Sequence, residues 1–153
     1  MNKQLLFESA QQLKPPKPEA VHEYENKRGA LVAKVNEIML NHQDLSKMIS
    51  RNHIEMMKDN HENHAKFMVS IFNVFNAEVL VETILWAFRA YKNRGFSSTY
   101  WAAQLDTWTT VLGKELSEES FKEIYPFYQW MQVNIPVFTD IAQQNTNSPF
   151  ATY

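Results

Sequence analysis

The 153-residue sequence contains no cysteine and only three glycines. The lack of cysteine excludes disulfides, thiolate metal sites and a cysteine nucleophile, and it fits a reducing compartment. Few glycines allow few tight turns, while ten phenylalanines, six tyrosines, four tryptophans and seven methionines supply a large apolar core. This combination favours helices over a β-sandwich. We therefore expect an all-α protein with a single core.

An excess of charge of one sign and long apolar runs are also missing. Lys and Arg number 15 against 17 for Asp and Glu, so no strong field marks a nucleic-acid partner. No stretch reaches the ~18 consecutive apolar residues of a membrane span, and residues 1–13 show no signal-peptide cleavage pattern. The sequence also lacks the G-x-S-x-G, P-loop, G-x-G-x-x-G and zinc-deaminase signatures. We expect a cytoplasmic, non-enzymatic protein that binds neither nucleic acid nor membranes.

Prolines and polar ends divide the chain into three parts. The KPPKP run at 14–18 must interrupt a helix because proline removes a backbone donor and fixes φ, so residues 1–18 are expected to form an arm or a short helix. Apolar residues recur at helical spacing across 19–143, which predicts roughly five to six main helices in one globin-like or bundle-like domain. Residues 144–153 are expected to form a polar tail.

Several residues predict where these helices begin and end. Asn76 and Ser117 are expected N-caps, because their side chains can accept hydrogen bonds from the free N–H groups of the first turn. Gly95 follows a basic last turn and is the expected stop between two helices. Pro126 and Pro136 are expected to start, kink or split helices in the C-terminal segment.

Three of the five histidines lie in the stretch 52–68, on a predicted helix. At about 100° per residue, His61 and His64 fall with Met57 and Met68 within an arc of about 100°, and charged residues occupy the opposite face. The histidines therefore point inward, where imidazoles need hydrogen-bond partners or a ligand. Three interpretations stay open: structural hydrogen bonds to a neighbouring helix, a polar contact in an organic-ligand pocket, or a metal site.

The spacing argues against ordinary metal and haem sites. His61 and His64 can share an ion, but His53 lies about 12 Å from His61 along the helix axis, so a third ligand would have to come from another helix. A globin-type proximal histidine is missing because no histidine follows His64, and Tyr91 near that position lies on a core stripe. We expect no haem, no metal and no cofactor, and leave open an unidentified small organic ligand.

A later predicted helix supplies a second apolar stripe with Trp101 and Trp108, and Gln104 lies at its rim. If a pocket forms between this helix and the histidine helix, Gln104 offers a polar contact in it. The hydroxyl groups of Tyr125 and Tyr128 can reach a buried histidine or a ligand from the C-terminal segment. The candidate ligand-binding residues are Met57, His61, His64, Met68, Trp101, Gln104 and Trp108.

The predicted helix from about 77 to 94 carries more apolar surface than one core needs. Val79 and Trp86 lie almost opposite its main apolar stripe. A tryptophan in such a place is typical of a subunit interface, unless the N-terminal arm or another helix covers it. We expect a homodimer that uses Val79 and Trp86, with the covered tryptophan as the alternative.

The block RAYKNRGFSSTYWAAQLDTW at 89–108 and the segment YPFYQWM at 125–131 are the most distinctive parts of the chain. With the helix order over residues 28–140, they resemble bacterial helical sensor modules that precede signalling or cobalamin-binding domains. More loosely, they are similar to the non-haem globin-like N-terminal domain of stressosome sensors. The resemblance implies a haem-free globin-like domain that dimerises through helices and senses an input. The junction 95–97 matches the helix junction of these modules and carries no catalytic role.

Three functional hypotheses follow from these observations. The first is a non-enzymatic, homodimeric sensor or interaction module that signals through contacts with a partner protein. The second is a carrier or binder of a small organic ligand or cofactor in a pocket between helices. The third is a metalloenzyme that uses His61, His64 and a carboxylate from another helix, which the sequence does not identify.

Overall fold

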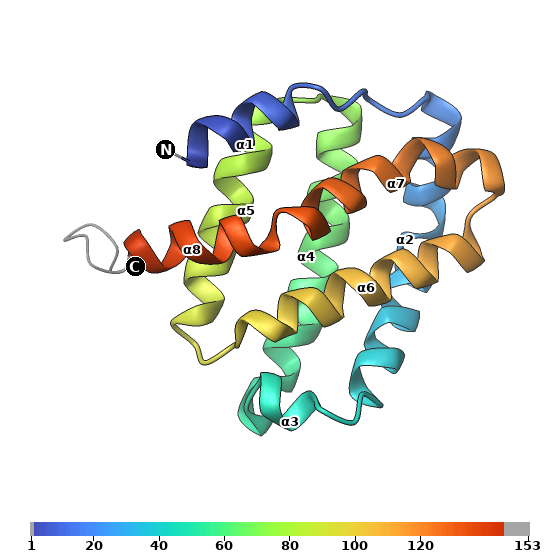
Figure 1. Cartoon of the computed structure of the whole chain (residues 1–153). Helices are drawn as coiled ribbons and strands as arrows, with labels where there is room; N and C mark the ends of the chain where they lie inside the picture. The colour runs from blue at the N-terminus through green and yellow to red at the C-terminus, as the bar shows by residue number, and fades with distance from the viewer. Residues whose placement is uncertain (1, 146–153) are drawn as a thin grey trace.

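A computed structural model describes residues 2–145, and these fold into eight α-helices and one 3₁₀ helix without a β-strand (Figure 1). The all-α prediction is confirmed. The structure does not confirm the expected number of five to six main helices. The globin-like arrangement stays a prediction. The helices are α1 Asn2–Ala10, α2 Pro18–Leu40, α3 Leu45–Met48, η1 Arg51–His53, α4 Ile54–Asn73, α5 Ala77–Lys92, α6 Ser98–Glu115, α7 Glu118–Val133 and α8 Ile135–Asn145.

The expected caps and the glycine stop are confirmed. The Asn76 side chain accepts a hydrogen bond from Val79 N–H at 3.0 Å and opens α5. The Ser117 hydroxyl accepts one from Ser120 N–H at 3.2 Å and opens α7. Gly95, between α5 and α6, has φ of +90°, a left-handed conformation that side chains with a Cβ rarely adopt. Each boundary therefore follows from local backbone chemistry.

The two C-terminal prolines behave differently. Pro126 lies inside α7, which nevertheless continues to Val133. Asn134 then separates α7 from α8, and its side-chain amide donates to the carbonyl of Trp130 at 2.8 Å. Pro136 is the second residue of α8, where the missing N–H costs nothing because it would have no intrahelical partner.

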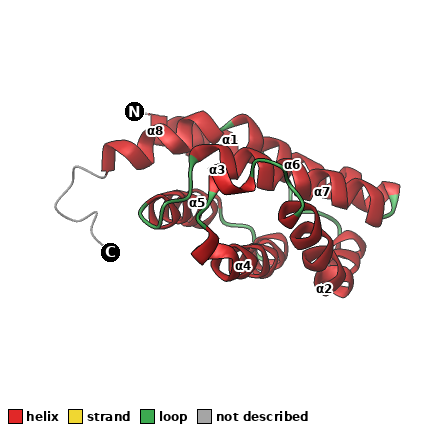
Figure 2. Ribbon diagram, turned by 90° about the horizontal axis from the view of Figure 1, so that it is seen from below, coloured by secondary structure: helices red, strands yellow, loops and turns green. Residues whose placement is uncertain are grey.

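The helices form two crossing layers. Helices α2, α4 and α5 lie on one side, and α6 with the α7–α8 pair runs across them on the other (Figures 1 and 2). Helix α2 packs against α4, α6 and α7, whereas α5 packs chiefly against α1 and α8. None of the helices within 2–145 combines the length and apolar character needed to span a membrane. The core lies between the two layers, where the inner faces of α4 and α6 meet.

The N-terminal segment forms the short helix α1 and packs on the body of the protein. Leu6 and Ala10 are buried, and the Trp130 indole N–H donates to the Ser9 hydroxyl at 2.9 Å. Helix α1 still leaves Trp86 53% exposed, so the alternative in which the arm covers this tryptophan is wrong. Of the expected tail, residues 144 and 145 belong to α8, and residues 146–153 lie outside the described part of the chain.

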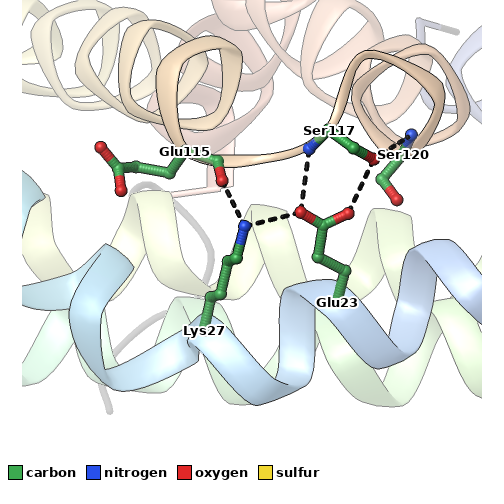
Figure 3. A network of polar contacts seen from close by, with 5 residues as sticks. All are labelled: Glu23, Lys27, Glu115, Ser117 and Ser120. Atoms are coloured by element: carbon green, nitrogen blue, oxygen red, sulfur yellow. Dashed lines mark hydrogen bonds and ion pairs between the residues drawn. The ribbon is translucent and has the colours of Figure 1, made fainter.

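A polar clamp joins α2 to the start of α7 (Figure 3). The Glu23 carboxylate accepts hydrogen bonds from the Ser117 N–H and the Ser117 hydroxyl, both at 2.8 Å. Lys27 donates to Glu23 at 2.7 Å and to the carbonyl of Glu115. Burial alone would raise the pKa of Glu23, but the hydrogen bonds from Lys27, Ser120 and Ser117 outweigh it and lower that pKa to about 2. The clamp fixes α7 beside α2.

The histidine helix has the expected inward face. Helix α4 is unbroken from Ile54 to Asn73, and Met57, His61 and Met68 on it are fully buried. His53 belongs to the preceding 3₁₀ turn and stacks on Phe96 with 5.9 Å between ring centroids. Helix α4 thus carries its imidazoles into the space between the layers.

Candidate functional site

A cavity of about 200 Å³ lies between α4, α5 and α6, is bordered by Met131 of α7 and Phe138 of α8, and opens toward the surface beside Trp86. Helices α4 and α5 stand side by side in one layer, and in the other layer α6 starts near the end of α5 and crosses α4 (Figure 1). Phe88 of α5 and Trp101 of α6 stack with 4.6 Å between ring centroids and form part of the wall. The apolar walls come from Phe67, Ile84, Phe88, Trp101, Leu105 and Phe138.

The polar groups of the cavity are neutral. They are Asn60, Asn63 and His64 from α4, Thr83 and Tyr91 from α5, and Gln104 from α6. Within the described part of the chain, no Asp, Glu, Lys or Arg lines the cavity. A charged ligand would lose its hydration without gaining a counter-ion, which is costly in a low-dielectric interior. The cavity therefore suits an uncharged molecule.

His64 connects the cavity to a buried chain of hydroxyl groups. Its Nε2 atom is 2.9 Å from the Tyr128 hydroxyl, which is 2.8 Å from the Tyr24 hydroxyl. Both tyrosines are fully buried. Their burial, the leading cause, raises the pKa of each phenol above its ordinary value. Both phenols therefore stay protonated and can each donate one hydrogen bond.

The direction of this chain follows from the burial of Tyr24. Its hydroxyl group has only Tyr128 as a hydrogen-bond partner among the described residues. A buried donor without a partner is rarer than an acceptor with a spare lone pair, so Tyr24 donates to Tyr128. Tyr128 then donates to His64 Nε2, and neutral His64 carries its proton on Nδ1.

Both inward histidines are neutral near pH 7. Burial lowers the pKa of His61 to about 4. Burial, with a smaller contribution from the neighbouring His61, lowers the pKa of His64 to about 3. Residue His64 as a whole is only half-buried because it lines the cavity, whereas its Nε2 atom is held by Tyr128.

His61 belongs to a second chain of polar groups and does not line the cavity. Its Nδ1 atom is 2.6 Å from Asn36 Oδ1, and its Nε2 atom is 3.1 Å from the Tyr100 hydroxyl. Tyr100 donates to Asn60 Oδ1 at 2.6 Å, and Gln104 Nε2 also donates to that oxygen at 3.5 Å. The chain runs from half-buried Asn36 on α2 to the cavity wall, so His61 has a structural role.

Gln104 has an unsatisfied polar atom at the cavity wall. The residue is 1% exposed, and its Oε1 atom has no hydrogen-bond partner within residues 2–145. The indole N–H of Trp108, whose ring centroid lies 5.0 Å from that of His64, also lacks one. An unmet buried acceptor costs about 1–3 kcal/mol, so a partner supplied by a ligand would recover that free energy.

The structure divides the predicted ligand-binding residues into two groups. His64, Trp101 and Gln104 line one cavity. The other four, Met57, His61, Met68 and Trp108, are buried in the core around it. Tyr128 reaches a buried histidine as expected, whereas Tyr125 stacks on Phe121 instead.

Sequence reasoning missed several cavity residues, including Asn60 and Phe88. Asn60 lies at about −60° from Met57 on the helical wheel, next to the inward arc, so periodicity alone offered a signal for it. Phe88 falls on the apolar stripe of α5, and periodicity does not distinguish a cavity wall from a filled core. Tyr100 and Asn36 join the site through contacts between helices, for which the sequence has no local signal.

A metal site and a subunit interface were also considered from the sequence. Among the described residues, no group of three His, Asp or Glu side chains is placed to hold a metal ion. Val79 and Trp86 are 45% and 53% exposed on α5, as an interface requires. Trp86 also borders the cavity, so the exposed apolar face and the cavity share one side chain.

A scan against protein-family models and searches of curated proteins and of solved structures find no match to this chain. The resemblance to bacterial sensor modules therefore stays a prediction. Functional inference rests on the cavity and its chemistry.

Proposed function

We propose that the protein is a non-enzymatic, cytoplasmic binder of a small uncharged organic molecule, held in the cavity between α4, α5 and α6. The observation that carries the proposal is the pairing of apolar walls with Gln104, a buried amide whose oxygen has no partner. Ligand sites in proteins typically combine mostly apolar walls with a few polar groups that orient the ligand.

The size of the cavity sets the size of the ligand. An apolar cavity of about 150 Å³ engineered in another protein binds benzene, and sites for drug-sized molecules start at about 300 Å³. The cavity here, about 200 Å³, lies between these values. It therefore accommodates one ring with a small substituent, and it is too small for haem or a cobalamin.

The experiment that tests this proposal uses toluene as an uncharged probe and benzoate as a charged one. Toluene should raise the thermal midpoint of the full chain in a concentration-dependent way, because it binds only the folded state. Benzoate should not. In Ala87→Phe the new ring fills the cavity, so the toluene effect should disappear, whereas Ala102→Phe, at an exposed position on α6, should keep it. The proposal is wrong if toluene leaves the wild-type midpoint unchanged up to saturation.

A sensor function is the second candidate, and the position of Trp86 favours it. This side chain borders the cavity and lies on the exposed apolar face with Val79. A ligand beside Trp86 would alter that face, and through it the association of two copies or the contact with a signalling partner. Sedimentation with and without toluene should show a ligand-dependent change in association that Trp86→Glu abolishes. Val133→Glu, at an exposed position on α7, should retain it, and a monomer under all conditions would contradict dimeric signalling.

A further inference from the structure

We infer that the ligand is a neutral single-ring aromatic molecule carrying a hydroxyl group, of which a phenol is the simplest case. The inference rests on the proposed binding function and specifies its chemical class. It depends on two polar groups of the cavity, His64 and Gln104, whose donor and acceptor roles are determined by their partners.

His64 offers a donor. Its Nε2 atom accepts a hydrogen bond from Tyr128 at 2.9 Å, and the Tyr128 hydroxyl accepts one from Tyr24 at 2.8 Å. Neutral His64 must then carry hydrogen on Nδ1, and this N–H has no hydrogen-bond partner among the described residues. His64 is half-buried, and its Nδ1 is not among the buried atoms without a partner, so water can accept from this N–H until a ligand in the cavity takes its place.

Gln104 offers an acceptor. The Asn60 oxygen already receives a hydrogen bond from Tyr100 at 2.6 Å, which fixes that oxygen toward α6. Gln104 therefore turns its NH₂ group to Asn60 at 3.5 Å, and its own oxygen is left without a donor. The side chain is 1% exposed and its oxygen is buried, so water does not compensate, and a ligand donor satisfies this oxygen once the amide turns toward the cavity that Gln104 lines.

A hydroxyl group meets both needs because it donates one hydrogen bond and accepts others. A hydrocarbon meets neither, an indole N–H only donates, and an aliphatic amine is protonated near neutral pH and finds no anion among the cavity residues of the described chain. The ring would lie among Phe67, Ile84 and Leu105, away from any ionised side chain among the described residues. The neutral phenol is favoured over the phenolate because no cation balances the charge.

The test compares p-cresol with toluene, which has the same ring and methyl group without the hydroxyl. Calorimetry on the full chain near neutral pH should give p-cresol an affinity at least about tenfold higher, since both unmet groups gain partners. Gln104→Met removes the amide at similar volume, so it should reduce p-cresol affinity about tenfold and leave toluene affinity unchanged. Gln129→Met makes the same replacement at an exposed position on α7 and should change neither affinity.

A measurement on the wild type covers the case in which Gln104→Met does not fold. The ¹⁵N signal of His64 Nδ1 should shift when p-cresol binds and stay nearly constant when toluene binds, because only the hydroxyl accepts from this N–H. Equal affinities for the two compounds, or an unchanged Nδ1 signal with p-cresol bound, would overturn the hydroxyl assignment while the binding proposal stood. Absence of binding by both compounds would remove the proposed function as well.

Discussion

The two nitrogens of the His64 ring have different neighbours. Nε2 is held in the core by the chain Tyr24–Tyr128, whereas Nδ1 has no hydrogen-bond partner among the described residues, and the ring borders the cavity. A rigid hydrogen bond at one nitrogen determines the tautomer and the ring orientation at the other. The buried tyrosines thus decide what His64 presents to a bound molecule.

Removal of the central hydroxyl in Tyr128→Phe tests this chain. The change leaves the Tyr24 hydroxyl and His64 Nε2 without partners in the core, so the free energy of unfolding should fall by about 2–3 kcal/mol. Urea denaturation measures it. The matched control is Tyr125→Phe on the same helix. The Tyr125 hydroxyl has no hydrogen bond in the described structure, so this change should lower the free energy of unfolding by less than about 0.5 kcal/mol. Equal losses in the two variants would mean that the chain does not stabilise the fold.

At the scale of helices, contacts near the cavity fix the position of α7 relative to α2. Glu23 holds the first turn of α7 (Figure 3). Tyr24, its neighbour on α2, meets Tyr128 farther along α7. A displacement of α7 would therefore separate the two hydroxyl groups and release His64. The exposed clamp and the buried chain act on one helix pair.

The variant Glu23→Gln tests the clamp. A neutral amide is a weaker acceptor than a carboxylate for the Ser117 groups and does not pair with Lys27, so stability should fall by about 1–2 kcal/mol near neutral pH. Urea denaturation again provides the measurement, with Glu25→Gln, an exposed position on α2, as the control without effect. The folded pKa of Glu23 is about 2, against an ordinary 4.5. The difference in unfolding free energy between variant and wild type should therefore shrink as pH falls from the ordinary pKa toward the folded one. A difference independent of pH would contradict the ionic role of Glu23.

At the scale of the whole molecule, the core contains two neutral imidazoles. Their folded pKa values, about 4 for His61 and about 3 for His64, lie below the ordinary 6.5 of the unfolded chain. Between these values the unfolded state binds more protons, so acid favours unfolding. The stabilising contribution is fully present above about pH 6.5 and is lost as pH falls toward the folded pKa values.

Unfolding free energy measured from about pH 7.5 to about pH 5 should therefore decrease by about 4 kcal/mol, roughly 2 kcal/mol for each histidine. The variant His64→Gln, which keeps an acceptor for Tyr128, should lose about half of this dependence. His22→Gln, at an exposed position on α2, should keep the wild-type dependence. A flat stability profile over this range would show that the two imidazoles are not buried in their neutral form.

Much of the fold was predictable because its signals are local. The caps Asn76 and Ser117 and the stop Gly95 each depend on backbone chemistry within a few residues, and they were found correctly. The inward face of α4 follows from helical periodicity alone. Pro126 shows the limit of such signals, because α7 continues past it while it packs on α2 and α6.

The sequence by itself determined that the chain is helical, where most helices begin and end, and that His61 and His64 face inward. Tertiary structure alone decided which of them meets the cavity, because their partners Tyr100 and Tyr128 lie 39 and 64 residues away. Periodicity records only which side of a helix is apolar. The partner of a buried polar group depends on which helices pack together, and that choice is made by the complete core.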